Sequence, residues 1–308
     1  MRTMVIVNPM ANKGRAGRRW PALRRELTTA IGAFDEAATT APGEATVLAR
    51  SALAAGYRRF VAVGGDGTVN ETMNGLVDAT GAIDPGIVLC PFPVGTANEL
   101  CRALSYAPGP AGALAAITSG KTRALDLVRC DFVGLDDRET TRHAYLIVSF
   151  GGAAEVSYRA SASPWLKKLG QIAYFLMGPP VILRYALRDI GQSIDDGPVA
   201  RRRVFTGMLG NCENGGGGLK LVPGARPDDG VLDYVELGAL RPFETILKIM
   251  LALFEGRHVL HPKVSTATGR AFRFTCETPT ILDIDGETVG RLPLAASIRP
   301  AALRVAVP

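Results

Sequence analysis

Residues 61–71 read Val61-Ala-Val-Gly-Gly-Asp-Gly-Thr-Val-Asn-Glu71. The apolar run 60–63 predicts a buried strand, three glycines end that strand within four residues, and 71–77 continues the chain as a helix. A strand that stops at glycines and leads into a helix presents free backbone N–H groups at the positive end of the helix dipole. The stretch therefore predicts a phosphate-binding loop.

Asp66 lies in the middle of this loop, between Gly65 and Gly67. Phosphate groups repel a carboxylate unless a divalent cation or a transferable proton lies between them. We therefore interpret the loop as a site for nucleotide phosphates and a metal ion, which indicates phosphoryl transfer. The alternative is a plain tight turn, because Asp and Gly are also the residues that turns favour.

Residues 1–122 alternate between short apolar runs and amphipathic segments, a pattern typical of βαβ units and a parallel sheet. We expect a first, α/β domain over this range. Its glycine-containing turns follow successive strands, so they open at the carboxyl edge of the sheet, where such folds bind ligands. The range contains expected strands at 4–7, 34–38, 60–63 and 86–90, and expected helices at 16–31, 43–55, 71–77, 98–104 and 111–118.

The pattern changes near Arg123, where segments with a period of two residues begin to dominate. Because Gly, Asp and Pro fill the turns between them, we expect a second domain over 123–297 that forms an antiparallel β-sandwich. Helical segments at 164–190 and 242–254 interrupt it. The closing segment 298–308 is expected to join the first domain.

The composition excludes several classes of function. The net charge of +6 favours anionic ligands, but only 6% of the residues are aromatic and no basic stripe is interleaved with them, so nucleic-acid binding is not indicated. Five widely spaced cysteines without a C-x-x-C motif indicate neither a zinc site nor a disulfide framework. We see no signal peptide and no apolar stretch long enough to cross a bilayer, and we expect a cytoplasmic protein.

A second acidic stretch, Ile281-Leu-Asp-Ile-Asp-Gly-Glu287, lies in the β-rich half. If it is one strand, Asp283, Asp285 and Glu287 point to the same face, because side chains alternate with a period of two. Three stacked carboxylates repel one another and favour a cation or a shared proton. Such a site suits a base that takes a proton from a hydroxyl substrate. An exposed Asp-Gly turn is the alternative.

Several motifs, in order along the chain, resemble those of the diacylglycerol kinase catalytic family, which includes bacterial soluble lipid kinases and the sphingosine and ceramide kinases. One departure is Glu99, where the family usually has Asp. The resemblance rests on Asn8-Pro9 with Lys13-Gly14, the isolated Thr39, Gly64-Gly-Asp-Gly-Thr68 with Asn70-Glu71, Pro93-Val-Gly-Thr-Ala-Asn-Glu99, the glycines 215–218, Pro223-Gly-Ala-Arg-Pro-Asp-Asp-Gly-Val-Leu-Asp233, Asp285-Gly-Glu287 and Arg299-Pro-Ala-Ala-Leu-Arg-Val305.

The resemblance implies an ATP-binding first domain related to NAD kinases and phosphofructokinases, and a second domain that binds the lipid. It implies Glu287 as the proton acceptor with Asp285 beside it, Asp66 acting through Mg²⁺, and chemistry in a cleft between the domains. It also implies a structural Mg²⁺ held by Asp229 and the carbonyl groups of Arg226 and Val231. The residues implied to hold ATP are Asn8, Thr39, Gly64, Gly65, Asp66, Gly67, Thr68, Val69, Asn70 and Thr96.

These expectations describe an ATP- and Mg²⁺-dependent lipid kinase in phospholipid metabolism, with diacylglycerol or phosphatidylglycerol as the acceptor. The segment 165–177 mixes lysines with large apolar residues, so we expect peripheral association with the membrane surface. The sequence leaves a homodimer open. The alternatives are an NAD kinase or phosphofructokinase-like enzyme, which share the Gly-Gly-Asp-Gly loop, and a nucleotide-binding membrane regulator without catalysis.

Overall fold

The computed structural model describes residues 1–95, 97–162, 171–239 and 249–308. Contacts between Cα atoms divide the chain into two compact units. Unit 1 comprises Met1–Leu125 and Ala301–Pro308, and unit 2 comprises Asp126–Pro300. Two long strands, β5 (Thr122–Gly134) and β17 (Glu287–Ala306), each continue from one unit into the other.

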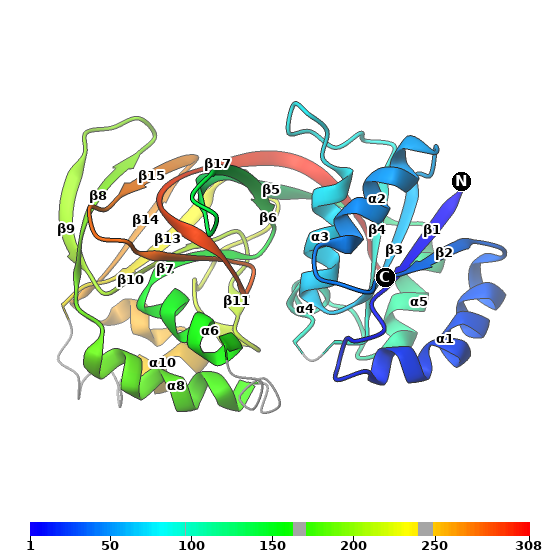
Figure 1. Cartoon of the computed structure of the whole chain (residues 1–308), viewed down its shortest axis with the longest axis horizontal. Helices are drawn as coiled ribbons and strands as arrows, with labels where there is room; N and C mark the ends of the chain where they lie inside the picture. The colour runs from blue at the N-terminus through cyan, green and yellow to red at the C-terminus, as the bar shows by residue number, and fades with distance from the viewer. Residues whose placement is uncertain (96, 163–170, 240–248) are drawn as a thin grey trace. The chain divides into compact units, whose positions relative to one another are not determined.

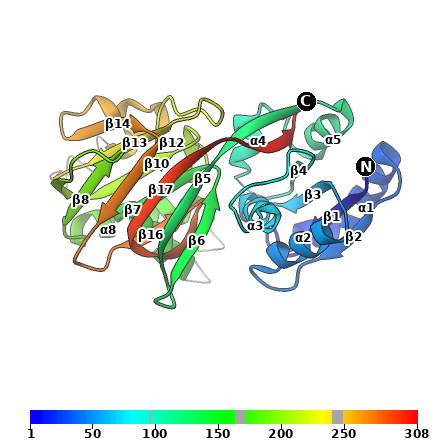
Figure 2. The same ribbon diagram turned by 90° about the horizontal axis from the view of Figure 1, so that it is seen from above.

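Unit 1 is an α/β unit built on a parallel sheet, with strand order β4-β3-β1-β2. Helices α1 and α5 cover one face of the sheet, and α2 and α3 cover the other (Figure 2). Its elements are β1 (Thr3–Val7), α1 (Arg15–Ile31), β2 (Asp35–Ala38), α2 (Glu44–Ala54), β3 (Arg59–Gly64), α3 (Asp66–Leu76), β4 (Val88–Pro93), α4 (Glu99–Ala103) and α5 (Pro110–Ser119). This architecture confirms the predicted parallel α/β domain.

The sequence pattern explains most of these elements. Leu23 and Leu27 lie one turn apart on α1 and are both buried, so they belong to the apolar face of this helix. The strand expected at 86–90 instead continues to Pro93, because parallel pairing with β3 extends to Gly64 opposite Pro93. A proline lacks the N–H donor but keeps its carbonyl acceptor, so two prolines do not end this strand.

Unit 2 is dominated by antiparallel strands, in the order β14-β13-β10-β7-β16-β17, with β15, β8 and β9 continuing from β17. Helices α6, α8 and α10 gather at one end of this unit (Figure 1). The remaining strands are β6 (Glu139–Ala144), β7 (Ile147–Gly151), β8 (Arg188–Ile194), β9 (Ala200–Val204), β10 (Thr206–Gly210), β11 (Asn214–Gly215), β12 (Leu219–Lys220), β13 (Leu232–Leu237), β14 (Val264–Gly269), β15 (Ala271–Thr275) and β16 (Ile281–Ile284). The described helices are α6 (Gly152–Ala162), α8 (Gln171–Arg184), α10 (Met250–Glu255) and the 3-10 helix η2 (Arg257–Leu260).

The core of unit 2 contains aromatic side chains from β7 and β13 in one layer and from β15 in the other. The ring centroids of Phe150 on β7 and Phe274 on β15 lie 4.7 Å apart, and Tyr234 on β13 lies 5.1 Å from Phe274. Such tilted ring pairs stabilise a core by more than their buried area alone. The layers therefore pack face to face, which confirms the predicted β-sandwich.

The helical segment expected at 164–190 is only partly correct. Residues 163–170 lie outside the described residues, α8 ends at Arg184, and 188–194 forms strand β8. The apolar run was ambiguous, because short apolar segments fit a buried strand as well as a helix. Helix α6 was not predicted from the sequence. Of the segment expected at 242–254, residues 242–248 lie outside the described residues and the remainder enters α10.

Candidate active site

The glycine loop of unit 1 is formed by a close approach of two backbone segments. A Cβ on Gly95 would lie 2.5 Å from the Cα of Gly65, and a Cβ on Gly64 would lie 2.3 Å from the Oγ1 of Thr68. Real Cβ atoms do not approach other atoms so closely, so only glycine fits at positions 64 and 95. The backbone N–H of Val94 and of Gly95 donate to the carbonyl oxygen of Gly64 at 3.0 and 3.1 Å. The two loops that the sequence analysis singled out separately are thus one structure.

Helix α3 starts in this loop with glycine at its N-cap, so no capping side chain covers its first turn. The resemblance implies phosphate beside the N–H groups of that turn, from Asp66 through Thr68. Val69 and Asn70 are buried, so their side chains pack inside the unit. The N–H of Val69 donates to the carbonyl oxygen of Gly65 at 3.1 Å, and the Oδ1 of Asn70 accepts from the Nδ2 of Asn74 at 3.0 Å, so both groups are already engaged within unit 1.

Asn8 and Thr39 lie at the ends of the neighbouring strands β1 and β2. The Nδ2 of Asn8 donates to the Oγ1 of Thr68 at 3.1 Å, which joins the first-strand turn to the glycine loop. Thr39 is buried, and its N–H donates to the carbonyl of Val7 at 2.8 Å. Because β1, β2 and β3 are parallel neighbours, these groups collect at one edge of the sheet. Thr96 lies outside the described residues.

Asp66 faces the start of α4. Its Oδ1 accepts the N–H of Leu100 at 3.4 Å. Burial raises the pKa of Asp66 above its usual value, and the backbone N–H groups of residues 98–100 oppose that shift. Glu99 is also buried and lies 3.8 Å from the guanidinium of Arg102. The half-buried carboxyl of Asp66 is a hard oxygen donor beside the first turn of α3, which is the donor type that Mg²⁺ prefers.

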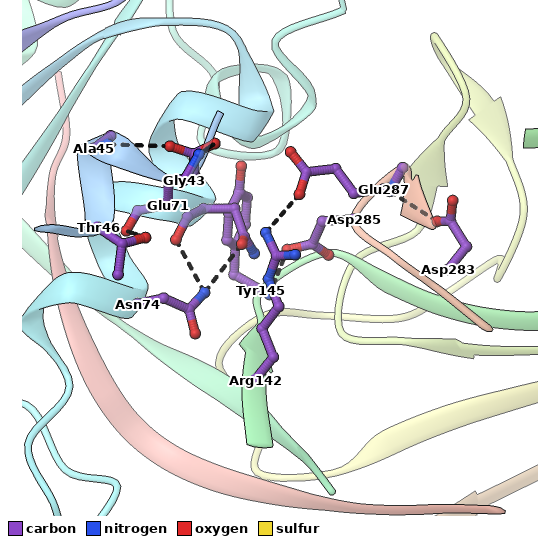
Figure 3. A network of polar contacts seen from close by, with 12 residues as sticks. Gly43, Ala45, Thr46, Glu71, Asn74, Arg142, Tyr145, Asp283, Asp285 and Glu287 are labelled. Carbon is purple, nitrogen blue, oxygen red and sulfur yellow. Dashed lines mark hydrogen bonds and ion pairs between the residues drawn. The ribbon is translucent and has the colours of Figure 1, made fainter. Parts of the chain in front are cut away.

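Glu71, the last residue of the opening motif, has a structural role in unit 1 (Figure 3). Its two carboxylate oxygens accept the N–H groups of Gly43 at 2.8 Å and Ala45 at 3.2 Å. Its carbonyl oxygen accepts the Thr46 hydroxyl at 2.9 Å. These contacts cap the N-terminus of α2 and fix it against α3. Glu71 is part of the motif in the sequence, but the motif itself does not indicate this structural role.

In unit 2, the acidic stretch is a hairpin and not a continuous strand. Asp285 and Gly286 form the two-residue turn between β16 and β17, with φ of 51° and 86°. Positive φ at both positions is the signature of the tight hairpin turn that matches strand twist. The expectation that Asp283, Asp285 and Glu287 share one strand face is therefore wrong, because the period of two ends at Ile284. Glu287 pairs with Ile284, whose side chain points to the opposite face from Asp283.

Each carboxyl of the hairpin has different partners. Asp285 turns back onto the backbone and accepts the N–H groups of Tyr145, Leu146 and Ile147, each at 3.0 Å. Asp283 is buried, accepting the Ser157 hydroxyl at 2.6 Å and the Gly286 N–H at 2.9 Å. Burial raises the pKa of Asp283 to about 6. Asp285 thus fixes the turn through its three hydrogen bonds, and Asp283 links the hairpin to Ser157 on α6.

Glu287 is an accessible carboxylate of this hairpin, with its side chain 40% exposed. The Nη2 of Arg142, on β6, donates to its Oε2 at 2.6 Å (Figure 3). A short charge-assisted bond of this kind fixes the carboxylate in one orientation. Arg142 was missed in the sequence analysis, because nothing in the local pattern of β6 shows that it faces residue 287.

The predicted structural metal site maps to an exposed loop of unit 2. Asp229 is exposed, and its Oδ1 accepts the N–H of Val231 at 3.3 Å. The buried Asp126 accepts the N–H of Gly230 at 2.7 Å and donates its own N–H to Pro227 at 2.7 Å. Asp126 was missed, although an isolated acid in the apolar run Leu125-Asp-Leu-Val128 was a signal. In the part of the chain that the structure describes, no three His, Cys, Asp or Glu side chains gather as metal ligands.

Two family models match the chain in succession. The model described as the diacylglycerol kinase catalytic domain matches residues 2–130, and the model described as the YegS C-terminal NAD kinase beta sandwich-like domain matches residues 146–307. No helix among the described residues is long and apolar enough to span a bilayer.

The chain is also similar to whole proteins. It is 29% identical to a diacylglycerol kinase of Staphylococcus epidermidis, over 95% of this chain and 87% of that protein. It is 28% identical to a diacylglycerol kinase of Staphylococcus carnosus, over 95% of this chain and 90% of that protein. A crystal structure of a diacylglycerol kinase from Bacillus anthracis superposes with a TM-score of 0.70 at 19% identity, covering 100% of this chain and 97% of that one.

A second crystal structure of a protein from Bacillus anthracis superposes with a TM-score of 0.79 at 23% identity, covering 100% of this chain and 95% of that one. At these identities, the two crystal structures support the fold. The family models and the relatives matched over most of their length confirm the resemblance that the motifs had indicated: the chain belongs to the diacylglycerol kinase catalytic family and is an ATP-dependent lipid kinase.

Proposed function

We propose that the chain phosphorylates diacylglycerol, with unit 1 holding ATP·Mg²⁺ and unit 2 supplying the lipid site and the base. The observation that carries this proposal is Glu287, an accessible carboxylate on a hairpin whose turn is fixed by Asp285. The printed names of the relatives support diacylglycerol as the acceptor. Phosphatidylglycerol is the second acceptor that we consider.

In unit 1, the N–H groups at the start of α3 and the side chains of Asn8, Thr39 and Thr96 bind the phosphate groups of ATP. Their value lies in positioning, because phosphoryl transfer asks for little covalent chemistry from the protein. The close contact of Gly65 and Gly95 supports this assignment, since it keeps side chains out of the loop and leaves the backbone donors accessible.

Asp66 would hold the catalytic Mg²⁺ directly or through water, since its carboxyl is the oxygen donor beside the loop amides. When bound, Mg²⁺ would offset negative charge on the phosphate oxygens. Asp229 and the carbonyl groups of Arg226 and Val231 would hold the structural Mg²⁺; these donors are all oxygen, as a hard cation requires. Asp126 would support that second site by fixing the loop through Gly230.

In unit 2, Glu287 accepts the proton of the lipid hydroxyl. The hydroxyl oxygen forms a bond to the γ-phosphorus of ATP, the bond between that phosphorus and the bridging oxygen breaks, and ADP leaves. Arg142 holds Oε2 of Glu287, so the other oxygen, Oε1, can be presented to the substrate. Asp285 acts as a positioning residue, because it fixes the turn that precedes Glu287. The lipid would be met at a membrane surface by peripheral association.

A panel of acceptors tests this proposal. The full chain is incubated with labelled ATP, Mg²⁺ and, in turn, diacylglycerol, phosphatidylglycerol, sphingosine or NAD. We expect label in diacylglycerol above all other acceptors. Preference for another lipid would overturn the choice of diacylglycerol, and ATP binding without transfer to any acceptor would favour a non-catalytic regulator.

A further inference from the structure

Unit 2 contains a cavity that is lined by none of the candidate active-site residues. It has a volume of about 270 Å³ and is lined by residues 187–189, 201–203 and 276–278. These segments are the start of β8 with the residue before it, the middle of β9 and the three residues that follow β15. The volume is just below the roughly 300 Å³ at which pockets for drug-sized ligands begin, so it suits a small ligand and not an acyl chain.

The lining of this cavity is strongly cationic. It contains four arginines, at positions 188, 201, 202 and 203, against two acids, Asp189 and Glu277. The excess is two positive charges. A phosphate monoester carries about −1.5 to −2 charges at pH 7, so its charge complements that excess. Guanidinium groups also match phosphate oxygens in pairs, which makes arginine the preferred side chain for this ligand.

One of these arginines, Arg202, is held in place by two neighbouring polar side chains. The Nη1 of Arg202 lies 3.9 Å from the buried carboxylate of Glu236. In the orientation that satisfies its amide, Gln192 accepts from the Nε of Arg202 at 3.0 Å and donates to Glu236 at 2.9 Å. The side chain of Arg202 is nevertheless 50% exposed. A cation that is fixed on one side and open on the other is pre-organised for an anion.

Arg188 adds a donor that has no acceptor. Its guanidinium lies over the ring of Tyr185, 4.8 Å from the centroid, and its Nε is buried without a hydrogen-bond partner among the described residues. The β8–β9 register places Ile190 opposite Arg202, so Arg188 and Arg202 come from the same face of the hairpin. A buried donor without an acceptor is costly, and an anion in the cavity that Arg188 lines would remove that cost.

The other two arginines are only weakly engaged. Arg201 lies 3.7 Å from Glu277 and Arg203 lies 3.8 Å from Asp189, and all four side chains are more than 70% exposed. Exposed pairs of this kind contribute little to stability. The register places Arg201 and Arg203 on the opposite face of the hairpin from Arg188 and Arg202, so they add positive charge beside the pocket without sharing that face. A simpler role for the triplet is to protect β9, which pairs with β8 alone among the described strands, from pairing with other chains. That role does not explain why Arg202 pairs with the buried Glu236 or why the Nε of Arg188 is buried.

We propose that this cavity, which we call the arginine pocket, binds a phosphate monoester dianion. Two sources share this chemistry, namely free inorganic phosphate and the head group of a phosphorylated lipid. The test titrates inorganic phosphate into the full chain by calorimetry, with a non-hydrolysable ATP analogue at saturation so that the nucleotide site is filled. A parallel arm measures sedimentation with phosphatidylcholine vesicles that contain or lack phosphatidic acid.

The variant Arg188→Gln/Arg202→Gln should weaken phosphate binding at least about tenfold, which is about 1.4 kcal/mol. Arg201→Gln/Arg203→Gln is a second variant that leaves the buried partners in place, and it should weaken binding in the same direction. Glu277→Gln should tighten binding by up to about fivefold, because it removes a competing carboxylate. Arg138→Gln is the matched control, since Arg138 is 84% exposed and pairs with Asp136 at 3.8 Å in the same unit.

Binding to phosphatidic acid vesicles that inorganic phosphate displaces, and that the arginine variants lose, would identify the lipid head group as the source. Phosphate binding that depends on the arginines, with vesicle sedimentation that does not, would identify free phosphate. Equal affinity of the wild type and both arginine variants would overturn the proposal. So would the absence of binding to both inorganic phosphate and phosphatidic acid vesicles.

Discussion

The glycine loop of unit 1 and the acidic hairpin of unit 2 are both short turns that present candidate catalytic groups, but they are built differently. The loop is held by backbone packed against backbone at Gly65 and Gly95. The hairpin is held by a side chain, because the Asp285 carboxylate accepts three consecutive backbone N–H groups. The glycines that allow the loop can be recognised in a sequence, whereas the distant backbone groups that hold the hairpin turn cannot.

The largest effect on stability is expected from removing the Asp285 carboxylate. Asp285→Ala leaves three N–H groups in a buried segment without their acceptor, and we expect the free energy of unfolding to fall by about 4.5 kcal/mol, at roughly 1.5 kcal/mol for each bond to a charged group. Urea unfolding of the full chain measures it. Asp285→Asn keeps one acceptor oxygen and should lose less. Equal stability of Asp285→Ala and the wild type would show that backbone alone holds the hairpin, as in the glycine loop.

The sequence predicted the loop in more detail than the hairpin. Glycines at 64, 65 and 67 predicted a strand that ends in a phosphate-binding loop and leads into a helix. The structure has that strand and that helix, but α3 begins at Asp66 and not at Glu71, so only Gly65 lies between the two elements. The three carboxylates of the hairpin were identified as a group, but their orientation was wrong because Asp285-Gly286 forms a tight turn, which was only the alternative to a single strand. Arg142 and Asp126 act on residues more than 100 positions away, so no local pattern could reveal them.

A second prediction concerns the buried acid of the hairpin. The pKa of Asp283 rises from 3.8 to about 6 in the folded state, so below about pH 4 its carboxyl is neutral in both states and costs nothing. Between about pH 4 and 6 the unfolded chain releases the proton while the folded chain keeps it, so stability falls as the pH rises. Relative to Asp283→Asn, the wild type should therefore lose roughly 3 kcal/mol between pH 4 and 7.

Urea unfolding of both proteins across this pH range measures the difference. Asn can still accept from Gly286 and can donate to Ser157, so the variant should fold. A difference that does not change with pH would mean that Asp283 is ionised at no cost in the folded state. The hairpin would then resemble an ordinary exposed turn.

The smallest effect is expected from the glycine loop, where adding one methyl group should have different effects at two neighbouring glycines. Gly95→Ala places a Cβ 2.5 Å from the Cα of Gly65, so backbone must move, and we expect a loss of about 2 kcal/mol. Gly65→Ala is the matched variant. Its Cβ would meet the Cα of Gly95 at 3.5 Å, an ordinary contact, so its stability should stay within about 0.5 kcal/mol of the wild type. Equal losses in both variants would show that the contact is not what requires glycine.

The central claim is that the two units divide the reaction, with the base on the hairpin of unit 2. The most direct measurement is transfer of label from ATP to diacylglycerol by Glu287→Gln, together with its ATP affinity. A Gln side chain keeps the size of Glu and a contact for Arg142 but cannot accept the proton. Glu139→Gln, an exposed glutamate on β6, is the control. We predict that Glu287→Gln lowers the transfer rate by about 10²- to 10⁴-fold and leaves ATP affinity unchanged. Transfer at the wild-type rate would contradict the account.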